Sequence, residues 1–181
     1  MDTLSYKEKL KVFNGTEKYF RELDFLEKLV EPGFNQTVLD IGCGLGTAIK
    51  YFQKINRAHY YGYDVVDYTG QKEWFIDKID SSFNKMYFMH SFAHISEPDK
   101  LLMRLRALVM QEIVVVTPNA LWLERMRNDK YVPDPTVVKH YNIDELTELF
   151  TNAGFKTKAC GQFGEYKDGY NERIFYVGTV K

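Results

Sequence analysis

One stretch of the chain constrains its fold more than any other: residues 38–46 read VLDIGCGLG. A short apolar run with one acid passes directly into three glycines at alternate positions. Glycine costs conformational entropy and leaves nothing to pack, so its repeated use indicates a close approach to the backbone. A helix predicted over 47–55 starts where the glycines end, and a strand–glycine turn–helix unit presents backbone N–H groups to a ligand. The stretch therefore predicts a ligand site at the carboxyl end of the first strand.

The remaining chain alternates strands and helices. Apolar periodicity predicts helices over 16–30, 47–55, 97–109 and 142–155. Apolar runs bounded by turn residues predict strands over 37–41, 59–64, 85–90, 112–118, 156–163 and 172–180, with a short strand near 74–76. The last two long strands form a hairpin through YKDGYN, and 119–140 is expected to be irregular. This alternation predicts an α/β fold with a mostly parallel sheet covered on both faces, and we expect one domain over 1–181.

The charge balance argues weakly against a nucleic-acid binder. The chain has 24 Lys and Arg against 25 Asp and Glu, whereas proteins that bind phosphates usually carry a basic excess. Local basic patches could still form from two runs, namely Arg104 with Arg106 and Arg125 with Arg127 and Lys130. The 13 Tyr and 13 Phe supply either a large aromatic core or an apolar acceptor pocket.

The chain shows no pattern of a secreted or membrane protein. Its opening residues have mixed charge and no apolar run, and no stretch approaches the roughly 18–20 apolar residues that span a bilayer. Cys43 and Cys160 lie far apart and suggest neither a disulfide framework nor a zinc site. We therefore expect a cytoplasmic protein without a membrane partner.

Two acids distinguish between the cofactors that use a glycine turn. A dinucleotide site of the form G-x-G-x-x-G would need glycine at position 47, where the chain has Thr47. Asp40, just before the glycines, would repel a pyrophosphate but favour an ammonium group. Asp64, at the end of the second strand, can accept hydrogen bonds from two ribose hydroxyls. Together these positions predict S-adenosylmethionine.

The segments VLDIGCGLGTAIKYF and YYGYD resemble the first two motifs of class I S-adenosylmethionine-dependent methyltransferases. YFMHSFAHISEPDKLLMRLRAL, EIVVVTPN and HYNIDELTELFTNAGF resemble later segments of a small-molecule subgroup that carries "EH" and "PN". The similarity covers about residues 20–155 in order. It implies a Rossmann-like, seven-stranded, mostly parallel sheet with helices on both faces and an antiparallel C-terminal hairpin strand. The cofactor-binding residues that it implies are Asp40, Gly42, Cys43, Gly44, Gly46, Thr47, Asp64, Asp77 and His90.

Three histidines are candidate catalytic residues. His90 and His94 flank SFA after the strand over 85–90, where a histidine can act as general base on a hydroxyl acceptor. In the quinone-ring O-methyltransferases and small-RNA 3′-end 2′-O-methyltransferases, the matching segment reads E-x-x-E-H and holds a divalent metal with a later histidine. Here the matching positions are His90, Ala93 and His94, and His140 could be the later histidine. Three imidazoles could bind zinc, whereas losing both carboxylates disfavours magnesium, so a metal is not expected but stays open.

Two segments are expected to cover the acceptor. TPN at 117–119 lacks the N-P-P-Y or D-P-P-Y pattern of methyltransferases that act on amino groups of bases or glutamine, which favours an oxygen, carboxyl or other small-molecule acceptor. The segment over 119–141 is predicted to cover the acceptor, with the N-terminal 1–30 as a helical lid. The candidate lining residues are Trp122, Met126, Tyr131 and Val132, with Tyr6, Phe13 and Tyr19 in the lid. Trp122 and Met126 could equally form one face of a short helix.

These features predict a methyltransferase that uses S-adenosylmethionine and acts on a small molecule, at oxygen. An RNA 2′-O-methyltransferase is the first alternative, although it needs a basic groove. A non-catalytic, cofactor-binding partner subunit is the second, because the E-x-x-E-H segment is altered and the chain over 65–85 is short. The acceptor and the oligomeric state stay open.

Overall fold

The computed structural model describes residue 8 and residues 14–126 and 134–180. These residues build one six-stranded sheet in the order β2-β1-β3-β4-β6-β5. The strands are β1 (Thr37–Ile41), β2 (His59–Tyr63), β3 (Phe83–Met89), β4 (Val109–Pro118), β5 (Lys156–Lys167) and β6 (Tyr170–Thr179). β1 to β4 are parallel, whereas β6 runs antiparallel to both β4 and β5. The mixed α/β sheet with a C-terminal antiparallel hairpin is therefore confirmed.

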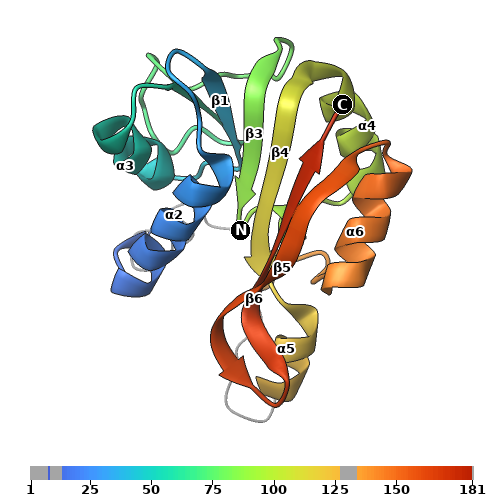
Figure 1. Ribbon diagram of the computed structural model, residues 1–181. Coiled ribbons are helices and arrows are strands. Elements are labelled where there is room, and N and C mark those ends of the chain that lie inside the picture. The colour runs from blue at the N-terminus through green and yellow to red at the C-terminus, as the bar shows by residue number, and fades with distance from the viewer. Residues whose placement is uncertain (1–7, 9–13, 127–133, 181) are drawn as a thin grey trace.

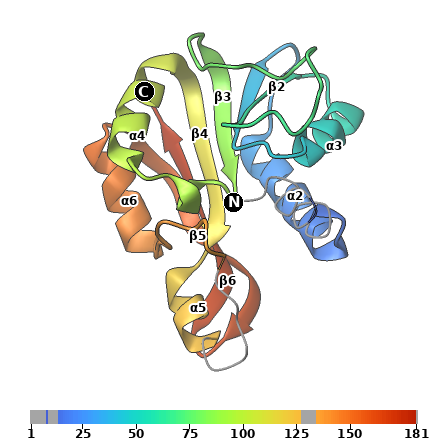
Figure 2. The same ribbon diagram turned by 180° about the vertical axis from the view of Figure 1, so that it is seen from behind.

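Helices cover both faces of the sheet (Figure 1, and from behind in Figure 2). The helices α2 (Glu17–Val30) and α3 (Thr47–Ile55) lie on one face, and α4 (Pro98–Leu108) and α6 (Ile143–Asn152) lie on the other. Successive residues of a strand point to opposite faces, so Val38 packs with α2 and α3 while Leu39 packs with α4 and α6. Two apolar cores result, one on each face of the sheet.

Local signals place the helix ends. The Thr16 side chain accepts from the Tyr19 N–H at 3.2 Å and begins α2, as predicted. Asn142 and Glu145 form a capping box that begins α6. Gly154 follows that helix with a φ of +88°, which glycine tolerates best.

The prediction of a seventh strand is wrong for the described residues, which form a six-stranded sheet. Near Trp74–Ile76 the structure has a single parallel bridge, between Phe75 and Gly62 at the β2 edge. The chain between β2 and β3 is too short to return through a full helix, and Asp67 folds part of it into a turn by accepting from the Thr69 and Gly70 N–H groups. In place of the predicted strand, the described residues have this one paired position, Phe75 with Gly62.

The region over 119–140 is not wholly irregular. It opens with α5 (Ala120–Met126), and Trp122 and Leu123 are its buried face. The hairpin strands β5 and β6 are longer than predicted, because the chain reverses in two residues at Asp168 and Gly169, both with positive φ.

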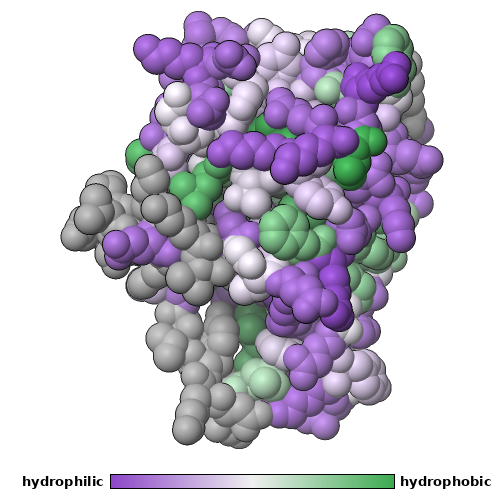
Figure 3. All heavy atoms as spheres, turned by 90° about the vertical axis from the view of Figure 1, so that its left-hand side faces the viewer, coloured by the Kyte–Doolittle hydropathy of each residue, from purple (hydrophilic) through white to green (hydrophobic). Residues whose placement is uncertain are grey.

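Within the described ranges, no helix is long and apolar enough to cross a membrane. The face that carries α2 and α3 is mostly hydrophilic, with apolar side chains in small separate groups (Figure 3).

Candidate active site

A cavity of about 710 Å³ opens where the parallel strands end. Ile41 lines it at the end of β1, Tyr63 at the end of β2, Met89 at the end of β3 and Pro118 at the end of β4. Ligands of open parallel sheets bind at this edge, so the cavity lies at the edge where the sequence predicts the ligand site. The predicted site residues that line the cavity are Gly42, Cys43, Gly44, Asp64, His90, His94 and His140.

The three glycines have different roles. Gly42, Gly44 and Gly46 all have positive φ, of +79°, +52° and +68°. A Cβ on Gly42 would lie 2.3 Å from Cβ of Ser91, and a Cβ on Gly46 would lie 2.2 Å from the ring of Trp74. Gly42 therefore makes room for Ser91 and Gly46 for Trp74, and of the three glycines Gly42 and Gly44 line the cavity. Ser91 and Trp74 are neighbours that sequence reasoning missed.

Asp64 is held by the glycine turn itself. Its Oδ2 accepts from the Gly44 N–H at 2.8 Å, and its Oδ1 accepts from the Val65 N–H at 2.7 Å. Burial raises the pKa of Asp64, while these backbone bonds and the nearby His94 act in the opposite direction. The carboxylate is thus fixed at the cavity wall, with lone pairs left on each oxygen.

Asp40 lies behind the cavity wall. It is 2% exposed and is not among the lining residues. Burial raises its pKa to about 8, although the Tyr87 hydroxyl beside it lowers the pKa and thus opposes this effect. Burial, with the nearby Asp40 and Asp64, also raises the pKa of the Cys43 thiol far above its usual range, which favours the neutral thiol. A direct contact between Asp40 and a ligand stays a prediction.

The other two predicted donor-site residues lie off the cavity. Thr47 begins α3, and its Oγ1 accepts from the Asn14 Nδ2 at 3.2 Å. Asp77 lines a second, smaller cavity of about 90 Å³ together with Leu101 and Arg104. Tyr63 lines both cavities, so it connects Asp77 to the main cavity, which Asp77 itself does not line.

Of the residues expected to cover the acceptor, Trp122 and Tyr19 line the cavity. Met126 belongs to α5 but is not a lining residue. Tyr6, Phe13, Tyr131, Val132, Arg127 and Lys130 lie outside the described residues.

His94 is the histidine with the best-defined neighbours. Its Nδ1 lies 2.9 Å from Oγ1 of Thr136, and that hydroxyl donates to Oδ1 of Asp134 at 2.7 Å. Both partners line the cavity and were missed by sequence reasoning. The signal that could have found them is DPT at 134–136, where an Asp precedes a Thr by two residues and can bond its N–H and hydroxyl.

The three candidate histidines do not form a metal site. In the part of the chain that the structure describes, which contains all three, no group of three or more His, Cys, Asp or Glu side chains is placed to hold a metal ion. His90 instead contacts Glu22 through Nε2, and burial lowers the pKa of His90 so that the ring favours its neutral form. The three-imidazole zinc site does not form.

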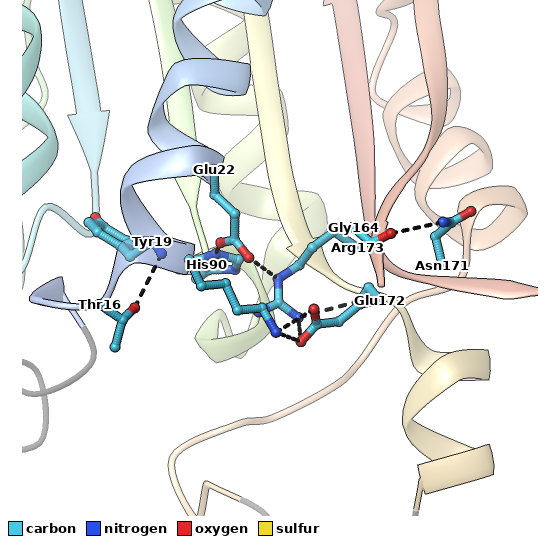
Figure 4. A network of polar contacts seen from close by, with 9 residues as sticks. Thr16, Tyr19, Glu22, His90, Gly164, Asn171, Glu172 and Arg173 are labelled. Carbon is cyan, nitrogen blue, oxygen red and sulfur yellow. Dashed lines mark hydrogen bonds and ion pairs between the residues drawn. The ribbon is translucent and has the colours of Figure 1, made fainter. Parts of the chain in front are cut away.

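A buried ionic network makes up another part of the cavity wall (Figure 4). From His90 it runs to Glu22 on α2, whose Oε1 lies 3.0 Å from Nε of Arg173 on β6. Nη1 of Arg173 lies 2.9 Å from Oε1 of Glu172, which also pairs with Lys18. Sequence reasoning missed this network, although Glu22 on the apolar face of α2, beside Leu23 and Leu26, was a visible signal.

Comparisons with solved structures support the fold. The chain is similar to an S-adenosylmethionine-dependent methyltransferase from Aquifex aeolicus, with 19% identity, a TM-score of 0.70, and coverage of 97% of this chain and 98% of that one. It is similar to magnesium protoporphyrin IX methyltransferase from Synechocystis with bound S-adenosylhomocysteine (14% identity, TM-score 0.69, coverage 98% and 94%). It also resembles a chain of the Haloferax volcanii complex between the Trm112 methyltransferase activator and a methyltransferase (13% identity, TM-score 0.70, coverage 97% and 94%).

No curated protein matches the chain in sequence. The sequence profile of the methyltransferase domain family matches residues 8–159, most of the chain. The glycine turn, the acid after β2 and the strand order agree with this match. The chain therefore belongs to the methyltransferase domain family.

Proposed function

We propose that the chain transfers a methyl group from S-adenosylmethionine to an oxygen atom of a small-molecule acceptor. One observation carries the proposal: the glycine turn, Asp64 and His94 border the same cavity. Its volume of about 710 Å³ lies in the range of about 300–1,000 Å³ that small-molecule sites occupy.

The wall around the glycine turn suits an adenosine ligand with a cationic tail. Asp64 keeps free lone pairs on both carboxylate oxygens, which can accept from the two ribose hydroxyls. Gly42 and Gly44 let the ligand approach the backbone without a side chain in the way. Asp40 lies directly behind them with its pKa raised by burial to about 8, and a positive charge on the other side of the wall would lower that pKa and favour the ionised form. The residues present therefore fit the donor.

His94 is proposed as the general base. The donor supplies a methyl group on a positively charged sulfur. As the oxygen–methyl bond forms and the sulfur–methyl bond breaks, His94 takes the proton of the acceptor hydroxyl and later releases it to solvent. The products are the methylated acceptor, S-adenosylhomocysteine and one proton.

One of the two possible basic patches, Arg104 with Arg106, is bound to backbone carbonyls. Arg104 donates to the carbonyl of Ile79, and Arg106 donates to the carbonyls of Gly154 at 3.1 Å and Val180 at 3.0 Å. These two side chains are thus engaged in holding the fold. With a net charge of −1, the chain offers little attraction for a phosphate backbone. An RNA acceptor would give salt-dependent RNA retention in a filter-binding assay, which we do not expect.

Calorimetric titration with S-adenosylmethionine and S-adenosylhomocysteine tests the donor site. We expect Asp64→Ala to raise the dissociation constant at least about tenfold, since a tenfold change corresponds to about 1.4 kcal/mol, or one good polar contact. Asp80→Ala is the matched control, because Asp80 is an exposed acid paired with Lys78. Absence of binding by the unmodified chain at millimolar ligand would overturn the proposal.

A cofactor-binding partner subunit is the second candidate function. It is favoured by His90 and Ala93 standing where E-x-x-E-H has its two carboxylates. The two candidates are separated by measuring S-adenosylhomocysteine formation with a panel of phenols, sugars and carboxylates. Turnover by the isolated chain supports the enzyme, whereas donor binding without turnover across the panel supports the partner subunit.

A further inference from the structure

The contacts of His94 point to a specific arrangement of protons. We infer that Asp134 and Thr136 hold the neutral His94 ring with its proton on Nδ1, which leaves Nε2 as the basic nitrogen. The contacts are those between Nδ1 and Oγ1 of Thr136, at 2.9 Å, and between that oxygen and Oδ1 of Asp134, at 2.7 Å. This inference deepens the proposed function, on which its catalytic meaning rests.

Counting hydrogens assigns the tautomer. A contact of 2.7 Å between two oxygens needs a hydrogen between them, and an ionised carboxylate has none to give. The single hydroxyl hydrogen of Thr136 therefore points to Asp134. The same oxygen can then meet Nδ1 of His94 only as an acceptor, so Nδ1 must carry a hydrogen.

The arrangement is supported on both sides by backbone contacts. The Thr136 N–H also donates to Oδ1 of Asp134 at 2.9 Å, which holds the two side chains in one turn. The following residues, Val138 and Lys139, donate their N–H groups to the carbonyl of Ala93 at 2.9 and 3.1 Å. Residues 134–139 are thereby fixed against the helix η1 (Phe92–His94) that carries the imidazole.

The second ring nitrogen is available for chemistry. His94 lines the cavity and is partly exposed, and its Nε2 has no hydrogen-bond partner within 14–126 and 134–180. A neutral ring with its hydrogen on Nδ1 presents a lone pair on Nε2, the form that can accept a proton from a hydroxyl. Thr136 and Asp134 act through the ring, so they are positioning residues.

Nitrogen-15 NMR of the histidine rings tests the inference without donor or acceptor. At a pH where the ring is neutral, we expect a protonated Nδ1 and an unprotonated Nε2 for His94, with His94→Gln used to assign its signals. Thr136→Val removes the oxygen acceptor and should move the ring toward the Nε2–H form, whereas Thr136→Ser should keep the Nδ1–H form. Thr147→Val is the matched control, because its hydroxyl donates to the Ile143 carbonyl in α6. An Nε2–H ring in the unmodified chain, or a tautomer unchanged by Thr136→Val, would overturn the inference.

Kinetics separates this inference from the proposed function. With an acceptor found in the panel, Thr136→Val should lower kcat at least about tenfold while the dissociation constant of S-adenosylmethionine stays within twofold, since general bases contribute about 10²–10⁴ in rate. Thr136→Ser should restore most of that loss. An unchanged kcat in Thr136→Val contradicts the positioning role, even where donor binding and turnover support the methyltransferase. Absent donor binding contradicts the proposed function and leaves the NMR result to decide the tautomer.

Discussion

Two walls of the cavity are built in opposite ways. The glycine wall, which consists of Gly42, Cys43, Gly44 and Asp64, is held by hydrogen bonds from its backbone N–H groups to the Tyr63 carbonyl and to the Asp64 carboxylate. The ionic wall, which consists of His90, Glu172 and Arg173 with Glu22 behind them, is held by the buried pairs that Arg173 makes with Glu22 and Glu172. The first depends on the absence of side chains, and the second on the pairing of large ones. The two walls should therefore fail differently when they are mutated.

The largest effect is expected at the ionic wall. Arg173→Met leaves Glu22 and Glu172 buried without their shared cation, and breaking a buried pair costs about 3–5 kcal/mol. Urea unfolding measures the loss. Arg21→Met is the control, because its pair with Glu17 is exposed and is worth below about 1 kcal/mol. Equal losses for the two variants would show that burial does not set the strength of this wall.

The glycine wall should show a steric effect that is smaller than the loss at the ionic wall. Gly42→Ala combines a positive φ with a Cβ that would lie 2.3 Å from Cβ of Ser91, and we expect a loss of about 2–3 kcal/mol in unfolding free energy. Gly70→Ala separates the two causes. Gly70 has a φ of +63° but nothing within 4 Å of an added Cβ, so its loss should be about 1 kcal/mol. If Gly70→Ala costs as much as Gly42→Ala, the close approach of Ser91 is not what requires the glycine.

The pH dependence of the unfolding free energy tests the protonation state of Asp40, behind the glycine wall. Its folded pKa is about 8 against 3.8 for the free acid, so between these values the unfolded chain ionises while the folded chain keeps its proton. Stability from this group is therefore present below pH 3.8 and is lost as pH rises toward 8, by up to about 1.4 kcal/mol per pH unit. Asp40→Asn should remove this dependence. Unfolding free energies at pH 5 to 8 measure it, and parallel curves for the two proteins would contradict the buried, protonated acid.

The smallest effect is expected away from both walls. Asn142→Ala removes the capping box of α6 and should cost about 1 kcal/mol in unfolding free energy. Its dissociation constant for S-adenosylmethionine should stay unchanged, because Asn142 does not line the cavity. If this variant bound the donor more weakly, a loss of stability far from the cavity would be enough to impair binding. Weaker binding in a variant at either wall would then not show that the mutated residue contacts the donor.

The glycine wall could be predicted from the sequence, whereas contacts between residues far apart in the chain could not. The glycine turn, the acid after β2 and the helix from Thr47 lie within one short segment, so their spacing predicted both the local structure and its ligand class. The prediction of a strand near Trp74–Ile76 was wrong. A short apolar run pairs along its whole length only if the flanking chain holds it parallel to the edge strand, and here one residue pairs. The spacing assigned Gly46 to the ligand, which stays a prediction, but could not show that Gly46 also makes room for Trp74, a residue 28 positions away.

By itself, the sequence determined the parallel α/β order, the cavity edge and the methyltransferase family, because each is encoded in periodicity or in a local motif. Only the tertiary structure decided which side chains complete the cavity. Glu22 on α2 meets Arg173 on β6, 151 positions further along the chain, and Thr136 reaches His94 from 42 positions away. Such contacts form because desolvated charges and hydrogen-bonding groups need partners, and the fold determines which partners are within reach.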